Sequence, residues 1–341
     1  MYLVSAGQLS SLYQISTVVI VAKALHYGAS PLMPVEILHL EVEPRGEGWY
    51  RILVDGKRVK YLSIDGGIYD DDDMCFPPVL VDKLPPLPPG DWNVGHIGKS
   101  GDSEDPQFVK TEKKILNGVC QLWHPTTIDV LSLRQEKRIM SNVLVVTSDH
   151  FELPVIAKFA RFEVEIPYYD HETEAYRWLQ QQPGDSIGPR FLGHLAEEGR
   201  IIGFLLEKIE GHHAEPEDLS SCQDVLSKLH GVGILHGDVN KHKFLVSDSR
   251  TVLIDFECSS RTNDTDAKRR ELASLPDELS SVSGKGGTVE YPPDMYEEMD
   301  IIYERDGGWS DELLRQALKG QITMTSEENK AMLRKQRGES P

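Results

Sequence analysis

The chain has 341 residues, a formal net charge of −19 and 39% hydrophobic residues, which fits a globular protein of one large domain or two modest ones. The acidic charge disfavours general nucleic-acid binding, although a local cationic pocket could still bind ATP. No run of about eighteen apolar residues occurs, so we expect no membrane partner. The four scattered cysteines form no CxxC pair, and we expect a reducing, cytoplasmic location.

The N-terminal part of the chain begins with a poorly defined segment, residues 1–34, and continues with a β-rich extension, residues 35–76. In VEILHLEVE and WYRILV, apolar residues alternate with polar ones, and the turn Asp55-Gly56 leads into RVKYLSI. This pattern predicts a β-meander. The run Asp70–Asp73 lacks the spaced oxygen ligands of a calcium loop, so we expect a solvated turn there.

Residues 77–125 are predicted to be a connector rich in proline and glycine. The stretch PPVLVDKLPPLPPG excludes a regular helix or a central strand, because proline lacks the backbone N–H. Lys83, Pro86 and Pro89 match the basic-x-x-Pro-x-x-Pro spacing of ligands for proline-binding modules. A partner protein could bind this strap, or the strap could simply pack on its own chain.

The pattern changes near residue 126. Three β-rich segments, TIDVLSL, SNVLVVT and LPVIAKF, precede a helical stretch, HETEAYRWLQQQ, and further strands in RIIGFLLEKIEG. A second apolar helix over 216–231 then leads into HGD. We therefore predict an α+β fold with an N-lobe and hinge over 126–211, a compact C-lobe over 212–325 and a charged tail over 326–341.

Three motifs carry a family resemblance. HGDVNKHKFLV (236–246) and VLIDFE (252–257) follow VIAK (155–158) and a helix that bears glutamates. In this order they resemble the protein-kinase-like superfamily, and HGD with DFE is most similar to aminoglycoside phosphotransferases and choline kinases. The resemblance implies a two-lobed fold that uses ATP and Mg²⁺ to phosphorylate a hydroxyl of an unknown protein or small-molecule acceptor.

The resemblance also implies roles for individual residues, which would mainly position the phosphates and neutralise their charge. A helix glutamate should pair with the lysine of VIAK, and Glu172 is preferred over Glu174 because Ala175, Tyr176 and Leu179 share its face. The implied roles are phosphate binding by Lys158, substrate positioning by Asp238, magnesium binding by Asp255, and adenine binding by the hinge residues Glu207 and Ile209.

Two departures from the family pattern concern activity. Lys243 stands where the family has an asparagine that binds magnesium, and an ammonium has donors but no acceptor. It could replace the second magnesium and neutralise the same phosphate charge, or the chain could be a pseudokinase that senses nucleotide or binds a partner protein. The expected nucleotide-covering loop, SLRQEKRIMSN (132–142), also contains no glycine.

Overall fold

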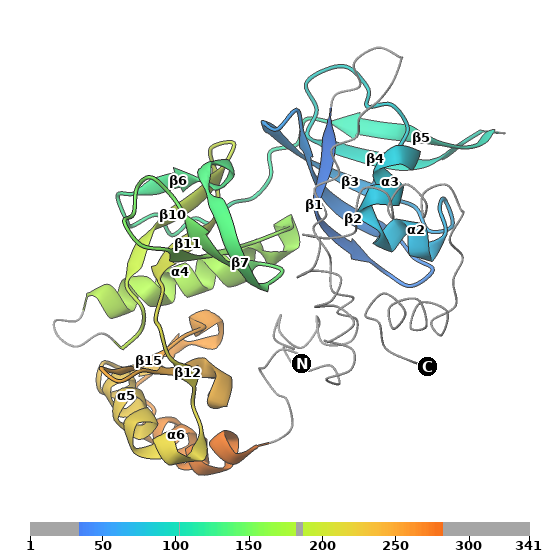
Figure 1. Cartoon of the computed structure of the whole chain (residues 1–341). Coiled ribbons are helices and arrows are strands. Elements are labelled where there is room, and N and C mark those ends of the chain that lie inside the picture. Colours follow the sequence, from blue (N-terminus) through green and yellow to red (C-terminus); the bar gives the residue numbers. More distant parts are fainter. Residues whose placement is uncertain (1–33, 102, 182–186, 282–341) are drawn as a thin grey trace, which may run out of the picture. The chain divides into compact units, whose positions relative to one another are not determined.

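The computed structural model describes residues 34–101, 103–181 and 187–281. The predicted segment 1–34, apart from its last residue, the part of the predicted C-lobe beyond residue 281 and the tail 326–341 lie outside the described residues. The described part mixes helices with several sheets, as the α+β prediction requires (Figure 1). None of its helices is long and apolar enough to cross a membrane.

The N-terminal extension forms a five-stranded sheet in the order β1-β2-β3-β4-β5. Strands β1 (Val35–Val42), β2 (Gly48–Val54) and β3 (Arg58–Ile64) make the predicted antiparallel meander. The tight β2–β3 turn places Asp55 and Gly56 at φ 57° and 64°, a conformation that glycine and, less readily, aspartate adopt.

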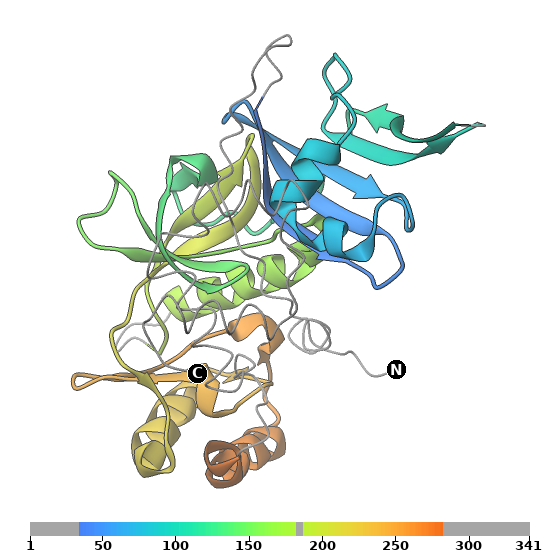
Figure 2. The same ribbon diagram turned by 45° about the vertical axis from the view of Figure 1, so that its right-hand side comes forward.

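Residues 77–112 of the segment predicted to be a connector instead belong to this sheet and its helices, whereas residues 113–125 form no helix or strand. Strand β4 (Val94–Ser100) pairs parallel to β3, and β5 (Ser103–Glu112) pairs antiparallel to β4. The prediction that this stretch excludes a regular helix was wrong for Pro77–Lys83, which form a short helix, α3. Proline is tolerated there because N–H groups in a first turn have no intrahelical partner. The aspartate run enters another helix, α2 (Asp71–Cys75), and both helices lie beside the sheet (Figure 2).

The next part of the chain forms a six-stranded sheet in the order β6-β10-β11-β9-β8-β7. Its strands are β6 (Thr127–Asp129), β7 (Arg134–Met140), β8 (Val143–Thr147), β9 (Val155–Phe159), β10 (Phe191–Glu197) and β11 (Arg200–Glu207). The glycine-free loop predicted over 132–142 is therefore mostly strand β7, followed by a turn at Ser141 and Asn142. Sequence periodicity missed β7 because most of its side chains are exposed.

Helix α4 (Ile166–Gln180) contacts strand β11 of this sheet. After the sheet come α5 (Leu219–Gly231) and α6 (Thr265–Ser280), which pack side by side (Figure 1). Two small sheets accompany these helices. One contains β12 (His212–His213), which precedes α5, with β14 (Phe244–Val246) and β15 (Thr251–Leu253); the other pairs β13 (Ile234–Leu235) with β16 (Ser260–Arg261).

A buried charge network joins the five-stranded sheet to the six-stranded sheet. Arg51 of β2 is 2% exposed and pairs with Glu197 of β10, which is 4% exposed. Arg200 contacts the same carboxylate at 2.9 Å, and the Tyr61 hydroxyl donates to it at 2.5 Å. Burial raises the pKa of Glu197, but Arg51, the Tyr61 hydroxyl and Arg200 together outweigh burial and lower it below its usual value. Removing one partner would leave a poorly compensated buried charge.

We expect Arg51→Met to lower the free energy of unfolding by about 3 kcal/mol, the low end of the range for breaking a buried pair, because Arg200 and Tyr61 still contact Glu197. Urea unfolding measures this change. The control is Arg58→Met, since Arg58 pairs with Asp55 at 3.3 Å and is 50% exposed; it should cost less than about 1 kcal/mol. Equal costs for the two variants would show that the network does not hold the sheets together.

Candidate functional site

Lys158 lies inside the six-stranded sheet, where β9 runs between β11 and β8. Its backbone neighbours are Phe204 on β11 and Val143 on β8. Its ammonium contacts Glu172 Oε2 at 2.6 Å and Asp255 Oδ1 at 2.5 Å. Burial disfavours this charge, but Asp255 and Glu172 outweigh burial and hold the pKa of Lys158 well above its usual range. The lysine is therefore charged at neutral pH.

Helix α4 brings Glu172, rather than Glu174, to this lysine. Glu172 is 1% exposed and shares the buried face of the helix with Tyr169, Ala175 and Tyr176. Glu174 accepts instead from Arg177 at 2.5 Å and from the Trp178 indole at 2.8 Å. Helical spacing alone therefore separates the two glutamates that the sequence left as alternatives.

Asp255 follows strand β15 and has a left-handed backbone, with φ 66° and ψ 67°. Such a conformation costs of order 1–3 kcal/mol for a residue other than glycine, and it persists only where its surroundings fix it. Here the next backbone N–H, that of Phe256, donates to Glu172 Oε1 at 3.2 Å. The Phe256 ring is fully buried against Tyr176 of α4. The same helix therefore holds both Lys158 and Asp255.

Lys243 reaches the opposite side of the same aspartate. Its ammonium contacts Asp255 Oδ2 and lies 3.3 Å from Asp238 Oδ2. The side chain is 9% exposed. Burial opposes the charge, but Asp255 and Asp238 outweigh it and raise the pKa of Lys243. The two ammonium groups in turn hold the pKa of Asp255 far below its usual range, against the effect of burial.

The segment that carries Asp238 is fixed by backbone geometry and by a distant glutamate. Gly237 has φ 85°, and a Cβ there would lie 2.3 Å from the Cys258 carbonyl oxygen, so only glycine fits. Glu271 of α6 accepts from the backbone N–H groups of His236 and Gly237, at 3.1 and 2.6 Å. Sequence reasoning missed Glu271, because it stands 34 residues after Gly237 and belongs to no motif.

The two polar neighbours of Asp238 are structural. His236 is fully buried, and its Nε2 donates to the Ile254 carbonyl at 3.1 Å. Asn240 caps the turn Lys241–Lys243 by accepting from the His242 N–H at 3.0 Å. It therefore does not take the position of the missing asparagine, and that position belongs to the Lys243 ammonium.

The predicted hinge residues Glu207 and Ile209 lie at the end of β11 and in the segment after it. The Glu207 N–H donates to the Arg190 carbonyl at 2.9 Å, and its carboxylate contacts Arg250 at 2.8 Å. Ile209 is half-buried. The arginine partners of Glu207 were not predicted, because they lie on separate segments with no shared pattern.

The magnesium site implied by the motifs does not fit this arrangement. Both carboxylate oxygens of Asp255 accept from ammonium groups, and ammonium cannot ligate a metal. Across residues 34–101, 103–181 and 187–281, no group of three or more His, Cys, Asp or Glu side chains is placed to hold a metal ion. A magnesium ion at Asp255 would first require Lys243 to leave.

The turn that precedes β8 lies beside Lys158 and is held by the five-stranded sheet. His39 Nε2 donates to the Ser141 carbonyl at 3.0 Å, and Arg51 Nη1 donates to His39 Nδ1 at 3.1 Å. Since a carbonyl only accepts and a guanidinium only donates, His39 must be neutral, with its proton on Nε2. Burial and then the Arg51 charge lower the pKa of His39 well below its usual value.

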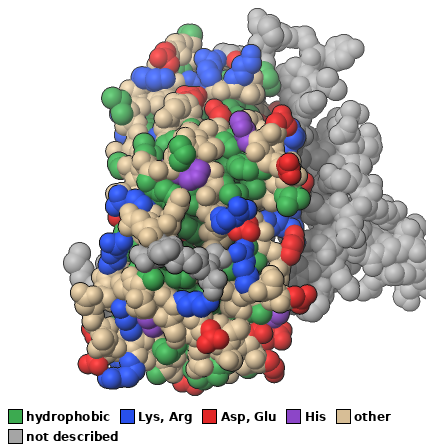
Figure 3. All heavy atoms as spheres, turned by 90° about the vertical axis from the view of Figure 1, so that its left-hand side faces the viewer, with side chains coloured by type: hydrophobic (Ala, Val, Ile, Leu, Met, Phe, Trp, Pro, Cys, Tyr) green, Lys and Arg blue, Asp and Glu red, His purple; other side chains and the backbone are tan. Residues whose placement is uncertain are grey.

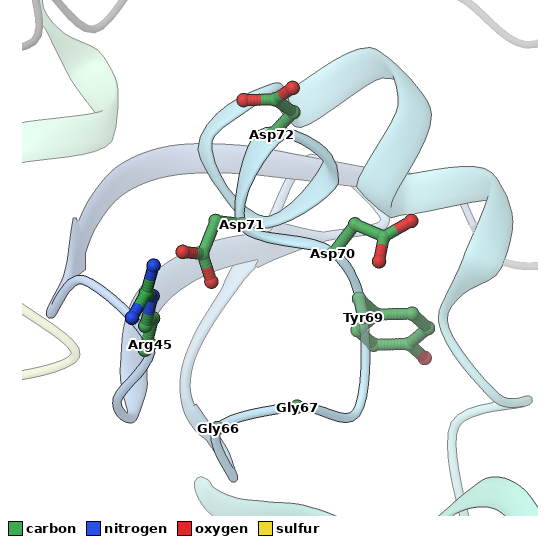
Figure 4. A pocket seen from close by; sticks show the side chains of 7 residues that line it. All are labelled: Arg45, Gly66, Gly67, Tyr69, Asp70, Asp71 and Asp72. Atoms are coloured by element: carbon green, nitrogen blue, oxygen red, sulfur yellow. The ribbon is translucent and has the colours of Figure 1, made fainter.

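A surface pocket occurs elsewhere, between the β1–β2 turn and the segment from β3 to α2. Arg45, Tyr69 and the carboxylates of Asp70, Asp71 and Asp72 line it (Figure 4). It contains none of the residues that surround Asp255, and three of its seven lining residues are aspartates. We therefore place the candidate site at Asp255.

Comparison with known proteins gives a partial match to a tRNA-modification protein. A probable bifunctional tRNA threonylcarbamoyladenosine biosynthesis protein from Methanoculleus marisnigri is 31% identical over 72 residues, which cover 20% of this chain and 14% of that protein. No family model matches the chain. The match fits a kinase-like, ATP-using domain only coarsely, and it spans far less than two thirds of the relative.

The neutral His39 makes stability depend on pH. Because its pKa is lowered on folding, the unfolded chain binds the proton first, and this contribution to stability is lost as pH falls below about 6.5. We expect His39→Gln, which keeps a donor and an acceptor, to flatten the pH dependence of unfolding between pH 7.5 and 5.5 by up to about 1.4 kcal/mol per pH unit. Urea unfolding at several pH values measures the slope, and replacement of the exposed His150 by Gln should leave it unchanged.

Proposed function

We propose that this chain contains an ATP-binding, kinase-like domain that transfers a phosphoryl group to a hydroxyl of a protein or small-molecule acceptor. The convergence of Lys158, Glu172, Asp255, Lys243 and Asp238 on one partly exposed point is the observation that carries the proposal. The order of strands, helix α4 and the HGD and DFE segments supports a two-lobed kinase-like fold, most similar in its motifs to aminoglycoside phosphotransferases and choline kinases.

The chain's own residues would act by position and charge. Lys158, held by Glu172, would contact the phosphates, and the backbone of Glu207 and Ile209 would bind the adenine edge. Asp238 is the residue that would accept a hydrogen bond from the acceptor hydroxyl and orient its oxygen toward the γ-phosphorus. In the transfer, that oxygen forms a bond to phosphorus while the bond to the ADP oxygen breaks, and the hydroxyl proton passes to Asp238 or to solvent.

Lys243 would neutralise part of the phosphate charge that a divalent cation neutralises in related sites. Its ammonium lies between Asp238 and Asp255, where it brings one positive charge, half that of a magnesium ion. On binding, the phosphates would compete with the two aspartates for this ammonium. We therefore infer that nucleotide binding needs little or no magnesium, in contrast to the magnesium dependence that the motifs alone imply.

A catalytically impaired, nucleotide-sensing pseudokinase is the second candidate. It is favoured by the two ammonium groups on Asp255 and by the turn at Ser141 and Asn142, which offers no glycine to bring backbone amides close to phosphates. This alternative keeps ATP binding but lacks transfer. Turnover therefore separates the two candidates, whereas ATP binding tests what they share.

The tRNA chemistry in the relative's name is not part of the proposal. The formal net charge of −19 opposes binding to a polyanion. On the face drawn in Figure 3, lysine and arginine side chains are scattered among acidic and neutral ones and form no continuous basic surface. A nucleotide, with few phosphates, needs only the local cations at Asp255.

Calorimetric ATP titration, in magnesium and in EDTA, tests the binding site. We expect the native chain to bind ATP in both buffers, and Lys158→Met to weaken binding by at least about tenfold, or 1.4 kcal/mol. Glu172→Gln should weaken binding, because Lys158 loses the partner that positions it, whereas Glu174→Gln on the same helix should not. Thermal unfolding confirms that each variant folds, and no binding by the native chain at about 1 mM ATP would refute both candidates.

Lys243→Asn tests the internal cation and separates the two candidates. The asparagine restores a neutral oxygen ligand, so we expect its ATP binding to become magnesium-dependent, while that of the native chain is not. ADP release is then measured for both proteins. Turnover by the native chain that Asp238→Asn abolishes supports the phosphotransferase, and turnover only after Lys243→Asn supports the pseudokinase.

A further inference from the structure

The proline-rich stretch that begins at the last residue of α3 packs on the core of the five-stranded sheet. It comprises residues 83–89, KLPPLPP, which we call the proline ridge. Proline fixes its own φ near −65° and pushes the preceding residue into an extended conformation. Leu84, the first residue after the helix, has φ −60° and ψ 137°, the values of a polyproline II helix. The sequence therefore imposes this backbone locally.

The exposure of the proline ridge repeats every three residues. Lys83, Pro86 and Pro89 are exposed, whereas the four residues between them are half-buried. Of these four, Leu84 and Leu87 pack against the core of the five-stranded sheet. A polyproline II helix has three residues per turn, so residues three apart share an edge. The leucine edge therefore anchors the ridge, and the edge with Lys83, Pro86 and Pro89 faces solvent.

Hydrogen bonds hold the ridge at both ends. The Tyr69 hydroxyl donates to the Lys83 carbonyl at 2.8 Å, and the Trp92 indole donates to the Pro88 carbonyl at 2.8 Å. Trp92 is itself 5% exposed and belongs to the core. The backbone is thus ordered before any partner binds, so a partner would not have to order it.

We propose that the proline ridge is a docking site for a partner protein domain of the SH3 type. Such domains bind polyproline II ligands in a groove lined by aromatic side chains, with the spacing basic-x-x-Pro-x-x-Pro that Lys83, Pro86 and Pro89 provide. A polyproline II ligand has three edges, because it has three residues per turn. Two of these edges contact the groove of the partner domain, and the third faces away from it. The third edge here is that of Leu84 and Leu87, which the chain's own core already covers.

Lys83 supplies the basic end of the ridge. Its side chain is 45% exposed and pairs with Asp73 of α2, which is 22% exposed. An exposed pair of this kind contributes little to stability, so a partner's carboxylate can take the ammonium from Asp73 at small cost. Asp73 and the other aspartates of α2 would repel a partner whose whole groove is acidic. A partner that has a single carboxylate, placed where it meets Lys83, is therefore favoured.

Fluorescence titration of the full chain with a panel of purified SH3 domains tests the proposal, with a synthetic peptide of residues 80–91 as reference. We expect at least one domain to bind the full chain, and to bind it no more weakly than the peptide, because the ridge is already extended. Replacing both Pro86 and Pro89 by Ala should weaken this binding at least about tenfold, whereas Pro125→Ala, at an exposed proline outside the ridge, should not change it.

Lys83→Glu provides a second test that leaves the proline backbone intact, and thermal unfolding checks that every variant folds. This charge reversal should also weaken binding several-fold, with a smaller effect at high salt. Binding of the peptide but not of the full chain would overturn the proposal, because it would show that the folded ridge is inaccessible. Absence of binding by every domain of the panel would overturn it as well. Neither result depends on ATP binding.

Discussion

The contact of Asp255 with two ammonium groups is the interaction on which the candidate site depends. Strand β9 supplies Lys158, helix α4 supplies Glu172 to hold that lysine, and the segment after Asp238 supplies Lys243. Each carboxylate oxygen of Asp255 accepts from one ammonium, which compensates burial and a left-handed backbone that cost energy on their own. Asp255 therefore joins two other segments directly, and helix α4 through Lys158.

The five-stranded sheet is tied to this site through buried polar groups rather than through apolar packing alone. Arg51 contacts Glu197 on the neighbouring sheet and also His39, which donates to the Ser141 carbonyl in the turn beside Lys158. Arg51, Glu197 and His39 are all buried, so breaking one of these contacts leaves a buried polar group with fewer partners. The N-terminal extension thus restrains the turn that would cover a nucleotide, a role that its strand pattern gave no reason to expect.

Patterns that are local in sequence were predictable, and contacts between distant segments were not. Alternation predicted the meander, helical spacing separated Glu172 from Glu174, and motif order predicted which residues converge. Strand β4 was missed because it pairs parallel to β3 across two intervening helices. Strand β7 was missed because most of its side chains are exposed, so its sequence shows no alternation of apolar and polar residues. The Glu271 contact and the Lys243–Asp255 pair depend on loop geometry, which no spacing rule gives.

An internal ammonium and a bound divalent ion offer a nucleotide different electrostatics. A magnesium ion brings two charges and open coordination positions, but it must be recruited from solution with the nucleotide. The Lys243 ammonium brings one charge, is always present, and donates hydrogen bonds that Asp238 and Asp255 already accept. A phosphate bound here would therefore have to displace carboxylate contacts rather than water. Such a site would neutralise less phosphate charge than a magnesium site, but its affinity for nucleotide would not depend on the magnesium concentration.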